Sequence, residues 1–169
     1  MVSTLYSLNL KTLVWTQLSP PIGFSGSREV PPPQARYFHS ACAWGETKLV
    51  IFGGEGYHSS SSSTTTSSDT ETSITEEPAP ALQTLDDLHI YNVEERKWEE
   101  VGQVKVRDGL ERPKPRYAHL GVVCTGEEEV EIDGEVRKRE KSSLMIMGGQ
   151  DIRNTCASLH FFISISHSR

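Results

Sequence analysis

The apolar residues of this chain are gathered in short runs that are rich in aromatic and β-branched side chains. Polar, charged or proline-rich segments separate the runs, and none of them shows a 3.6-residue stripe of helical length. Runs of about five to eight residues with this composition are typical of strands. The pattern therefore predicts an all-β protein built from antiparallel sheets.

Nine strands are expected from these runs. Four of them should follow one another in the centre of the chain, at residues 37–44, 48–52, 88–93 and 97–101. Two more are expected before residue 18, and three between residues 116 and 163.

Two segments differ in composition from the strands. Of the 17 residues from Ser59 to Thr75, 14 are Ser or Thr, and residues 57–83 are predicted to be disordered. Such a tract cannot bury enough apolar surface to offset the entropy lost on ordering. Of the 15 residues from Glu127 to Lys141, 11 are charged, which predicts a solvated loop or hairpin tip.

The proline-rich stretches 19–33 and 102–115 are expected to link strands, because proline supplies no amide donor to a β-ladder.

Three sequence elements occur twice, in the same order. One ends in Trp, one reads Arg-Tyr-x-His, and one is an apolar run that ends in Gly-Gly. Without the two biased segments, roughly 50 residues separate the Gly-Gly pairs, which suits a four-stranded repeat. The matching pairs are 5–15 with 88–98, 36–39 with 116–119, and 49–54 with 144–149.

These elements resemble the kelch repeat of β-propellers, a superfamily that also contains galactose oxidase. The resemblance covers nearly all of the chain outside the biased segments. It implies an all-β fold of about two four-stranded antiparallel blades that form an incomplete ring. It also implies that the motif residues hold blades together. Those residues are Trp15, Arg36, Gly53, Gly54, Tyr91, Trp98, Arg116, Gly148 and Gly149. From the general behaviour of buried guanidinium groups, Arg36 and Arg116 are expected to bond carbonyls of adjacent blades rather than a ligand.

The alignment divides the chain into three parts and a tail. Residues 4–18 are expected to be the last two strands of one blade. Residues 34–101 form a complete blade with the disordered insertion at 57–83. Residues 113–163 form a blade that lacks its fourth strand and carries the charged insertion 127–141, and 164–169 are a tail.

A closed propeller has roughly four to eight blades, more than this chain can supply. The chain is therefore expected to be a fragment of a larger kelch protein. Its long low-complexity insertion between strands resembles those of fungal kelch scaffold proteins, which implies a scaffold of that type. A truncated, non-functional gene product is the alternative. The remaining blades would come from a longer chain or from another copy.

We expect one of the two loop-bearing faces of the blades to carry the binding function. In an antiparallel meander the 2–3 loops and 4–1 links emerge on one face, and the 1–2 and 3–4 turns on the other. The 2–3/4–1 face carries the Ser/Thr tract and the proline-rich links, and we expect a protein partner to bind there. The resemblance implies a scaffold in cytoskeletal, polarity or signalling assemblies. Ser68 and Ser73 precede a glutamate by three residues and are candidate phosphorylation sites, although the tract is equally well explained as a tolerated insertion.

Charge, hydrophobicity and cysteine content limit which partners and which cellular location are expected. The formal net charge is −6, with 17 Lys and Arg against 23 Asp and Glu, which argues against a nucleic-acid partner. No apolar run is long enough to span a membrane, and the start of the chain does not resemble a secretion signal. Three widely spaced cysteines favour reduced thiols and a cytoplasmic protein.

No enzyme is expected, and no cofactor or metal. Asp87 and His89 should share one side of a strand, with Asp86 on the other, and two ligands are too few for a metal site. The alternative is a fragment of a galactose-oxidase-type metalloenzyme. However, Tyr37 and His39 recur as Tyr117 and His119, which favours a structural role for all four.

Overall fold

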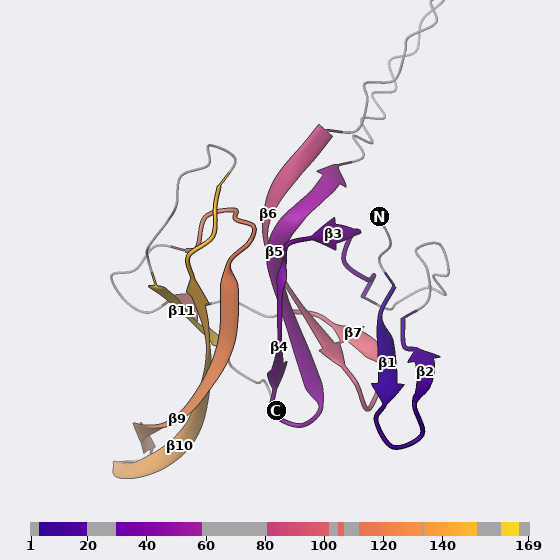
Figure 1. Ribbon diagram of the computed structural model, residues 1–169. Coiled ribbons are helices and arrows are strands. Elements are labelled where there is room, and N and C mark those ends of the chain that lie inside the picture. The colour runs from indigo at the N-terminus through magenta and orange to yellow at the C-terminus, as the bar shows by residue number, and fades with distance from the viewer. Residues whose placement is uncertain are drawn as a thin grey trace, which may run out of the picture.

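The computed structural model describes residues 4–19, 30–58, 81–101, 105–106, 112–132, 134–151 and 160–165. Eleven strands lie in these ranges, and no helix does, which confirms the all-β, antiparallel prediction there (Figure 1). The strands are β1 (Tyr6–Asn9), β2 (Val14–Gln17), β3 (Arg36–Tyr37), β4 (Ser40–Trp44), β5 (Lys48–His58), β6 (Ala81–Asn92), β7 (Lys97–Glu99), β8 (Lys105–Val106), β9 (Leu120–Ile132), β10 (Glu135–Met147) and β11 (His160–Ile165).

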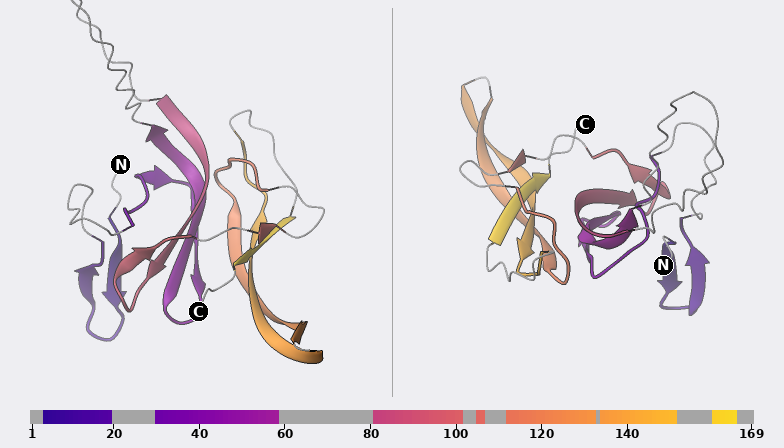
Figure 2. Two further views of the ribbon diagram at one scale, coloured as in Figure 1. Left: turned by 180° about the vertical axis from the view of Figure 1, so that it is seen from behind. Right: turned by 90° about the horizontal axis from the view of Figure 1, so that it is seen from above.

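Three antiparallel sheets are formed by these strands. The N-terminal hairpin pairs β1 with β2. The middle sheet has the order β3-β5-β6-β7, with β4 also paired to β5. The third sheet has the order β8-β11-β10-β9. Figure 2 shows the middle sheet lying between the hairpin and the third sheet.

Both faces of the middle sheet are covered, which explains its continuous apolar runs. Val50, Phe52 and Ile90 pack on one side against Leu144 and Ile146 of the third sheet, and all five are buried. Successive residues of a strand point to opposite faces. Burying each such side chain stabilises the fold by about 1.5 to 3 kcal/mol.

The other face of the middle sheet packs against the N-terminal hairpin. Ile51, Tyr91 and Trp98 are buried there, beside Leu5 and Leu18. The three sheets are therefore joined by two separate apolar clusters.

The repeated sequence elements have the same local geometry. In the hairpin turns, Asn9 and Asn92 each accept hydrogen bonds from the amides two and three residues further on, at 2.9 to 3.1 Å. Leu13 and Arg96, which align in the repeat, have φ values of 57° and 54°. Two different sequences thus form the same turn.

The expected first strand, 37–44, is interrupted. Phe38 has a φ of 53°, which ends β3 at Tyr37, and β4 begins at Ser40. Ala118 has the same φ of 53° before β9, so the interruption also repeats.

The ends of the segment predicted to be disordered are ordered strand. Tyr57 pairs with Leu82 and His58 with Ala81, which extends the β5–β6 ladder into the segment at both ends. Apolar cross-strand neighbours stabilise such an extension. The rest of the Ser/Thr tract, including Ser68 and Ser73, lies outside the described residues.

The charged segment 127–141 is a β-ribbon, which confirms the hairpin tip among the two predicted alternatives and excludes an unpaired loop. It is formed by the ends of β9 and β10, which pair without interruption up to the turn at Gly134. Oppositely charged residues face each other across it, such as Glu129 and Lys138, and this pairing stabilises the ribbon. β11 pairs only with residues 142–147 of β10, so the ribbon extends beyond the sheet (Figure 1).

A fourth strand is present in the third sheet, but it comes from upstream. β8, in the link predicted at 102–115, pairs with β11 through Lys105 and Val106. The third sheet therefore extends beyond the predicted range 113–163 at both ends, because β8 precedes that range and Ser164 and Ile165 of the predicted tail belong to β11.

Within the described ranges, the chain has no helix long and apolar enough to cross a bilayer.

Candidate functional site

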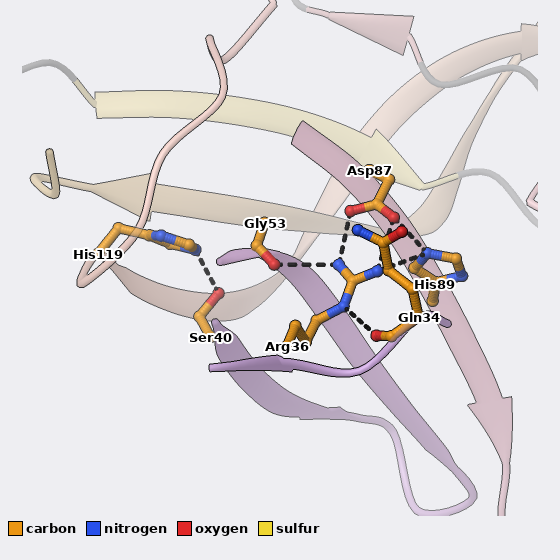
Figure 3. A network of polar contacts seen from close by, with 7 residues as sticks. All are labelled: Gln34, Arg36, Ser40, Gly53, Asp87, His89 and His119. Atoms are coloured by element: carbon orange, nitrogen blue, oxygen red, sulfur yellow. Dashed lines mark hydrogen bonds and ion pairs between the residues drawn. The ribbon is translucent and has the colours of Figure 1, made fainter. Parts of the chain in front are cut away.

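Arg36 is the centre of a polar network in the middle sheet (Figure 3). Its Nη1 donates to the carbonyl oxygen of Gly53 at 3.0 Å, and its Nε donates to the carbonyl oxygen of Gln34 at 3.2 Å. Both Nη atoms also bind the carboxylate of Asp87, at 2.6 and 2.7 Å. The Arg36 side chain is only 4% exposed. One guanidinium thus joins β3, β5 and β6.

Asp87 is held between Arg36 and His89. The Nε2 of His89 lies 2.7 Å from Oδ2 of Asp87, so these side chains share a face as predicted, while Asp86 is exposed. Partial burial alone would raise the pKa of Asp87, but hydrogen bonds from Arg36 and His89 outweigh it and lower that pKa far below its usual range. The carboxylate therefore serves as the counter-ion of Arg36.

Arg116 repeats the arrangement of Arg36 in the third sheet. Its Nη1 donates to the carbonyl oxygen of Gly148 at 2.9 Å, and its Nε to that of Lys114 at 3.1 Å. Desolvation lowers the pKa of the buried guanidinium, while the nearby charge of Asp151 opposes that shift. Each arginine therefore fixes the Gly-Gly end of its own repeat.

The expectation that the guanidinium groups bond carbonyls of adjacent blades is wrong for Arg36, whose partners Gln34, Gly53 and Asp87 belong to its own repeat. Arg116 likewise bonds two carbonyls of its own repeat, those of Lys114 and Gly148. A backbone contact joins the two repeats: the amide of Gly54 donates to the carbonyl oxygen of Arg116 at 2.9 Å.

The Gly-Gly pair of the middle sheet allows this close approach. Gly53 and Gly54 have φ values of 61° and 98°, in the region that favours glycine. A Cβ atom on Gly53 would lie 2.8 Å from the carbonyl oxygen of Arg116, and one on Gly54 would lie 2.7 Å from that of Tyr37. Gly149, with a φ of 87°, would meet the backbone of Tyr117 in the same way.

Ser40 and His119 join the middle and third sheets by their side chains. The Oγ of Ser40 lies 2.9 Å from Nε2 of His119, and both residues are buried (Figure 3). Burial, with a smaller contribution from Arg116, lowers the pKa of His119 to about 4. The imidazole is therefore neutral at pH 7. Its counterpart His39 is exposed, so the two histidines do not share one environment.

Tyr91 and Trp98 join the middle sheet to the N-terminal hairpin. The hydroxyl of Tyr91 donates to the carbonyl oxygen of Leu18 at 2.9 Å, and Nε1 of Trp98 donates to Oγ of Ser19 at 3.2 Å. Their rings pack edge to face, with centroids 5.0 Å apart. Trp98 is 7% exposed, whereas its counterpart Trp15 is 66% exposed and holds no sheet to another among the described residues.

Three aromatic rings are in contact where the Arg-Tyr-x-His segments of the two repeats meet, and Tyr57 shares a sheet face with one of them, Tyr37. We call Tyr37, Phe38, Tyr57 and Tyr117 the aromatic patch. The ring of Phe38 lies between those of Tyr37 and Tyr117, at centroid distances of 5.0 and 6.2 Å. The repeat predicts a structural role for Tyr37 and Tyr117 and no binding role for any residue of the patch. A signal was present, because Phe38 stands where the second repeat has Ala118.

No cluster of metal-ligating side chains is found in the described ranges. They contain no group of three or more His, Cys, Asp or Glu side chains that could hold a metal ion. A scan against protein-family models finds no match for the chain, and a search of the curated proteins finds none either.

Proposed function

We propose that this chain is part of a kelch-type β-propeller that acts as a non-enzymatic scaffold for protein binding. The N-terminal hairpin, the middle sheet and the third sheet would be successive blades around one axis. The observation that carries the proposal is the repeated arginine geometry. Arg36 and Arg116, 80 residues apart in the sequence (116 − 36), each bond the first carbonyl of a Gly-Gly pair and a carbonyl two residues upstream.

The stacking of the sheets supports the same proposal. Repeat proteins bury a continuous core by packing each unit on the next. The two apolar clusters and the Ser40–His119 pair join consecutive sheets in this manner. Three sheets are fewer than the roughly four to eight blades of a closed ring, so further blades from a longer chain or a second copy belong to the proposal.

The binding surface proposed is the end of the molecule at which β5 ends and β6 begins. Figure 1 places β3 at this end as well, and the tip of the β9–β10 ribbon at the other. Long connections on a rigid sheet scaffold are common recognition elements. A partner would thus contact the side that carries the Ser/Thr tract.

Affinity capture with two immobilised baits tests this function. One bait is the wild-type chain, and the other carries Gly54→Ala, which should disturb the contact between the two repeats. The proposal expects a partner that is retained by the wild type and lost with the variant, and that binds the purified wild type in a defined stoichiometry. Stoichiometric copper or iron in the purified chain would favour the galactose-oxidase alternative. The absence of any partner specific to the folded bait would contradict a scaffold role.

A further inference from the structure

The aromatic patch concentrates tyrosine at one end of the molecule. Three of the five tyrosines of the chain, Tyr37, Tyr57 and Tyr117, belong to it. They come from β3, from the end of β5 and from the segment before β9. The hydroxyl of Tyr117 donates to Oε1 of Gln150 at 2.8 Å, which fixes this ring from the third sheet.

Phe38 is the residue of the patch that the fold does not require. Its φ of 53° is unfavourable for a bulky residue, and its side chain is 60% exposed, so it contributes little to the core. Ala118 has the same φ at the equivalent position of the second repeat. Because the turn forms with a methyl group at that position, the phenyl ring of Phe38 is not needed for the turn and is available for binding.

The contact between the repeats holds the patch together. The carbonyl oxygen of Phe38 accepts a hydrogen bond from the amide of Ala118 at 2.9 Å. Tyr37 and Tyr117 are thereby both brought into contact with the Phe38 ring. The patch depends on both repeats and on their mutual position.

A carboxylate lies beside the patch. Glu55 is the cross-strand partner of Tyr37 and the second residue before Tyr57, so all three are on one face of the sheet. Desolvation, a hydrogen bond with Glu55 and the charge of that carboxylate raise the pKa of Tyr37, with smaller effects from Tyr57 and Tyr117. The neighbouring cation, Arg36, is bound to Asp87.

We propose that the aromatic patch, together with Glu55, binds an arginine side chain in an extended segment of a partner protein. The aromatic faces attract a cation through their quadrupole, and a planar guanidinium stacks on them better than an ammonium does. Glu55 supplies the complementary charge, and the net charge of −6 of the chain favours a basic partner. This inference rests on the proposed function, because it names the chemistry of the partner that the scaffold recognises.

Fluorescence polarisation with short labelled peptides tests the inference on the full chain. The probe is Gly-Arg-Gly-Arg-Gly-Arg, and the control peptide has citrulline in place of each arginine, which keeps the shape and removes the charge. We expect the arginine peptide to bind with a Kd in the range of about 10 μM to 1 mM and the citrulline peptide to bind at least about tenfold more weakly.

Two substitutions within the site are matched with two outside it. Phe38→Ala, which installs the residue of the second repeat, and Glu55→Gln should each weaken arginine-peptide binding about fivefold or more. Trp15→Ala removes an equally exposed aromatic ring, and Glu46→Gln removes a charge in the exposed β4–β5 turn. Neither should change the Kd by more than about twofold. Phe38→Tyr keeps an aromatic ring and should retain binding.

The inference is overturned if the citrulline peptide binds as well as the arginine peptide, or if neither peptide binds up to about 1 mM. It is also overturned if Phe38→Ala and Glu55→Gln both bind as the wild type does. A partner that is captured by the wild type and equally by Phe38→Ala would leave the scaffold function intact and move its binding site elsewhere. The experiment therefore distinguishes a failure of the proposed arginine site from a failure of the proposed scaffold function.

Discussion

His119 of the third sheet and Ser40 of the middle sheet share a buried hydrogen bond of 2.9 Å, and the imidazole in this bond is neutral at pH 7. The pair lies beside Phe52, whose ring centroid is 5.4 Å from that of His119. A polar contact and an apolar contact therefore coincide at the junction of the two sheets.

The stability of the chain should fall when the pH falls from about 6.5 to about 4. The pKa of His119 is about 4 in the folded chain and about 6.5 when unfolded, so the unfolded state binds more protons in this window. The contribution of His119 to the free energy of unfolding is fully present above pH 6.5 and reaches up to about 3 kcal/mol. Urea unfolding measured at pH 4.5 and pH 7 checks this expectation.

His119→Gln is the control for this pH dependence. The pKa of His39 is also lowered, by desolvation and by the charge of Arg36, and acts in the same direction. The difference between wild type and His119→Gln isolates the buried imidazole. Parallel stability curves for the two proteins would contradict a buried, neutral His119.

Trp98→Ala should destabilise the chain by about 3 to 5 kcal/mol, because it removes a buried indole and leaves a cavity beside Tyr91. Trp15→Ala should cost less than about 0.5 kcal/mol, because its side chain is 66% exposed. Chemical denaturation of both variants measures the contrast. Equal losses would mean that the hairpin is packed differently from this structure.

Arg36→Met should destabilise the chain by about 2 kcal/mol, because it removes the two hydrogen bonds to Asp87, a carboxylate that is 40% exposed. Part of this loss should be recovered in the double variant Arg36→Met, Asp87→Leu, which leaves no unpaired charge. A double-mutant cycle by urea unfolding gives the coupling energy. A coupling of zero would show that the ion pair does not contribute to stability.

Gly54→Ala should cost about 2 kcal/mol or more, because its Cβ would lie 2.7 Å from the carbonyl oxygen of Tyr37 and its φ is 98°. Gly45 has a φ of 62° but no atom within 4 Å of an added Cβ. Gly45→Ala should therefore cost only about 1 to 2 kcal/mol of backbone strain. Thermal unfolding compares the two, and the same melting temperature for both would exclude the steric explanation.

Removing the charged ribbon should leave the sheets nearly unchanged in stability. Residues 128–139 can be replaced by Asn-Gly, which joins the cross-strand partners Glu127 and Glu140 by a short turn. The ion pairs lost are exposed, including Lys138 with Glu127, and such pairs contribute about 0 to 1 kcal/mol. Urea unfolding provides the measurement. A loss of several kcal/mol would show that the ribbon packs on the core.

The all-β fold and the repeated elements could be predicted from the sequence because both depend on residues close together in the chain. Alternating apolar residues predict that Ile51 and Val50 point to opposite faces, and they are in different apolar clusters. The Gly-Gly ends and the Asn-led turns are local as well. Their geometry follows from the backbone conformations that each residue allows.

Contacts between distant segments could not be predicted from the same signals. Asp87 pairs with Arg36 across 51 residues, and Ile163 of β11 pairs with Val106 of β8 across 57 residues (163 − 106). The aromatic patch forms only when the two repeats meet. The exposure of Trp15 likewise depends on what packs against it, which its own sequence does not encode.

The most direct test of the account is a nuclear Overhauser measurement on the full chain in solution. If the two repeats are stacked, the ring protons of Phe52 and the imidazole protons of His119 should give a strong cross-peak, because their centroids are 5.4 Å apart. Cross-peaks within the β5–β6 and β9–β10 ladders but none between Phe52 and His119 would mean that the sheets form without stacking, and would contradict the account.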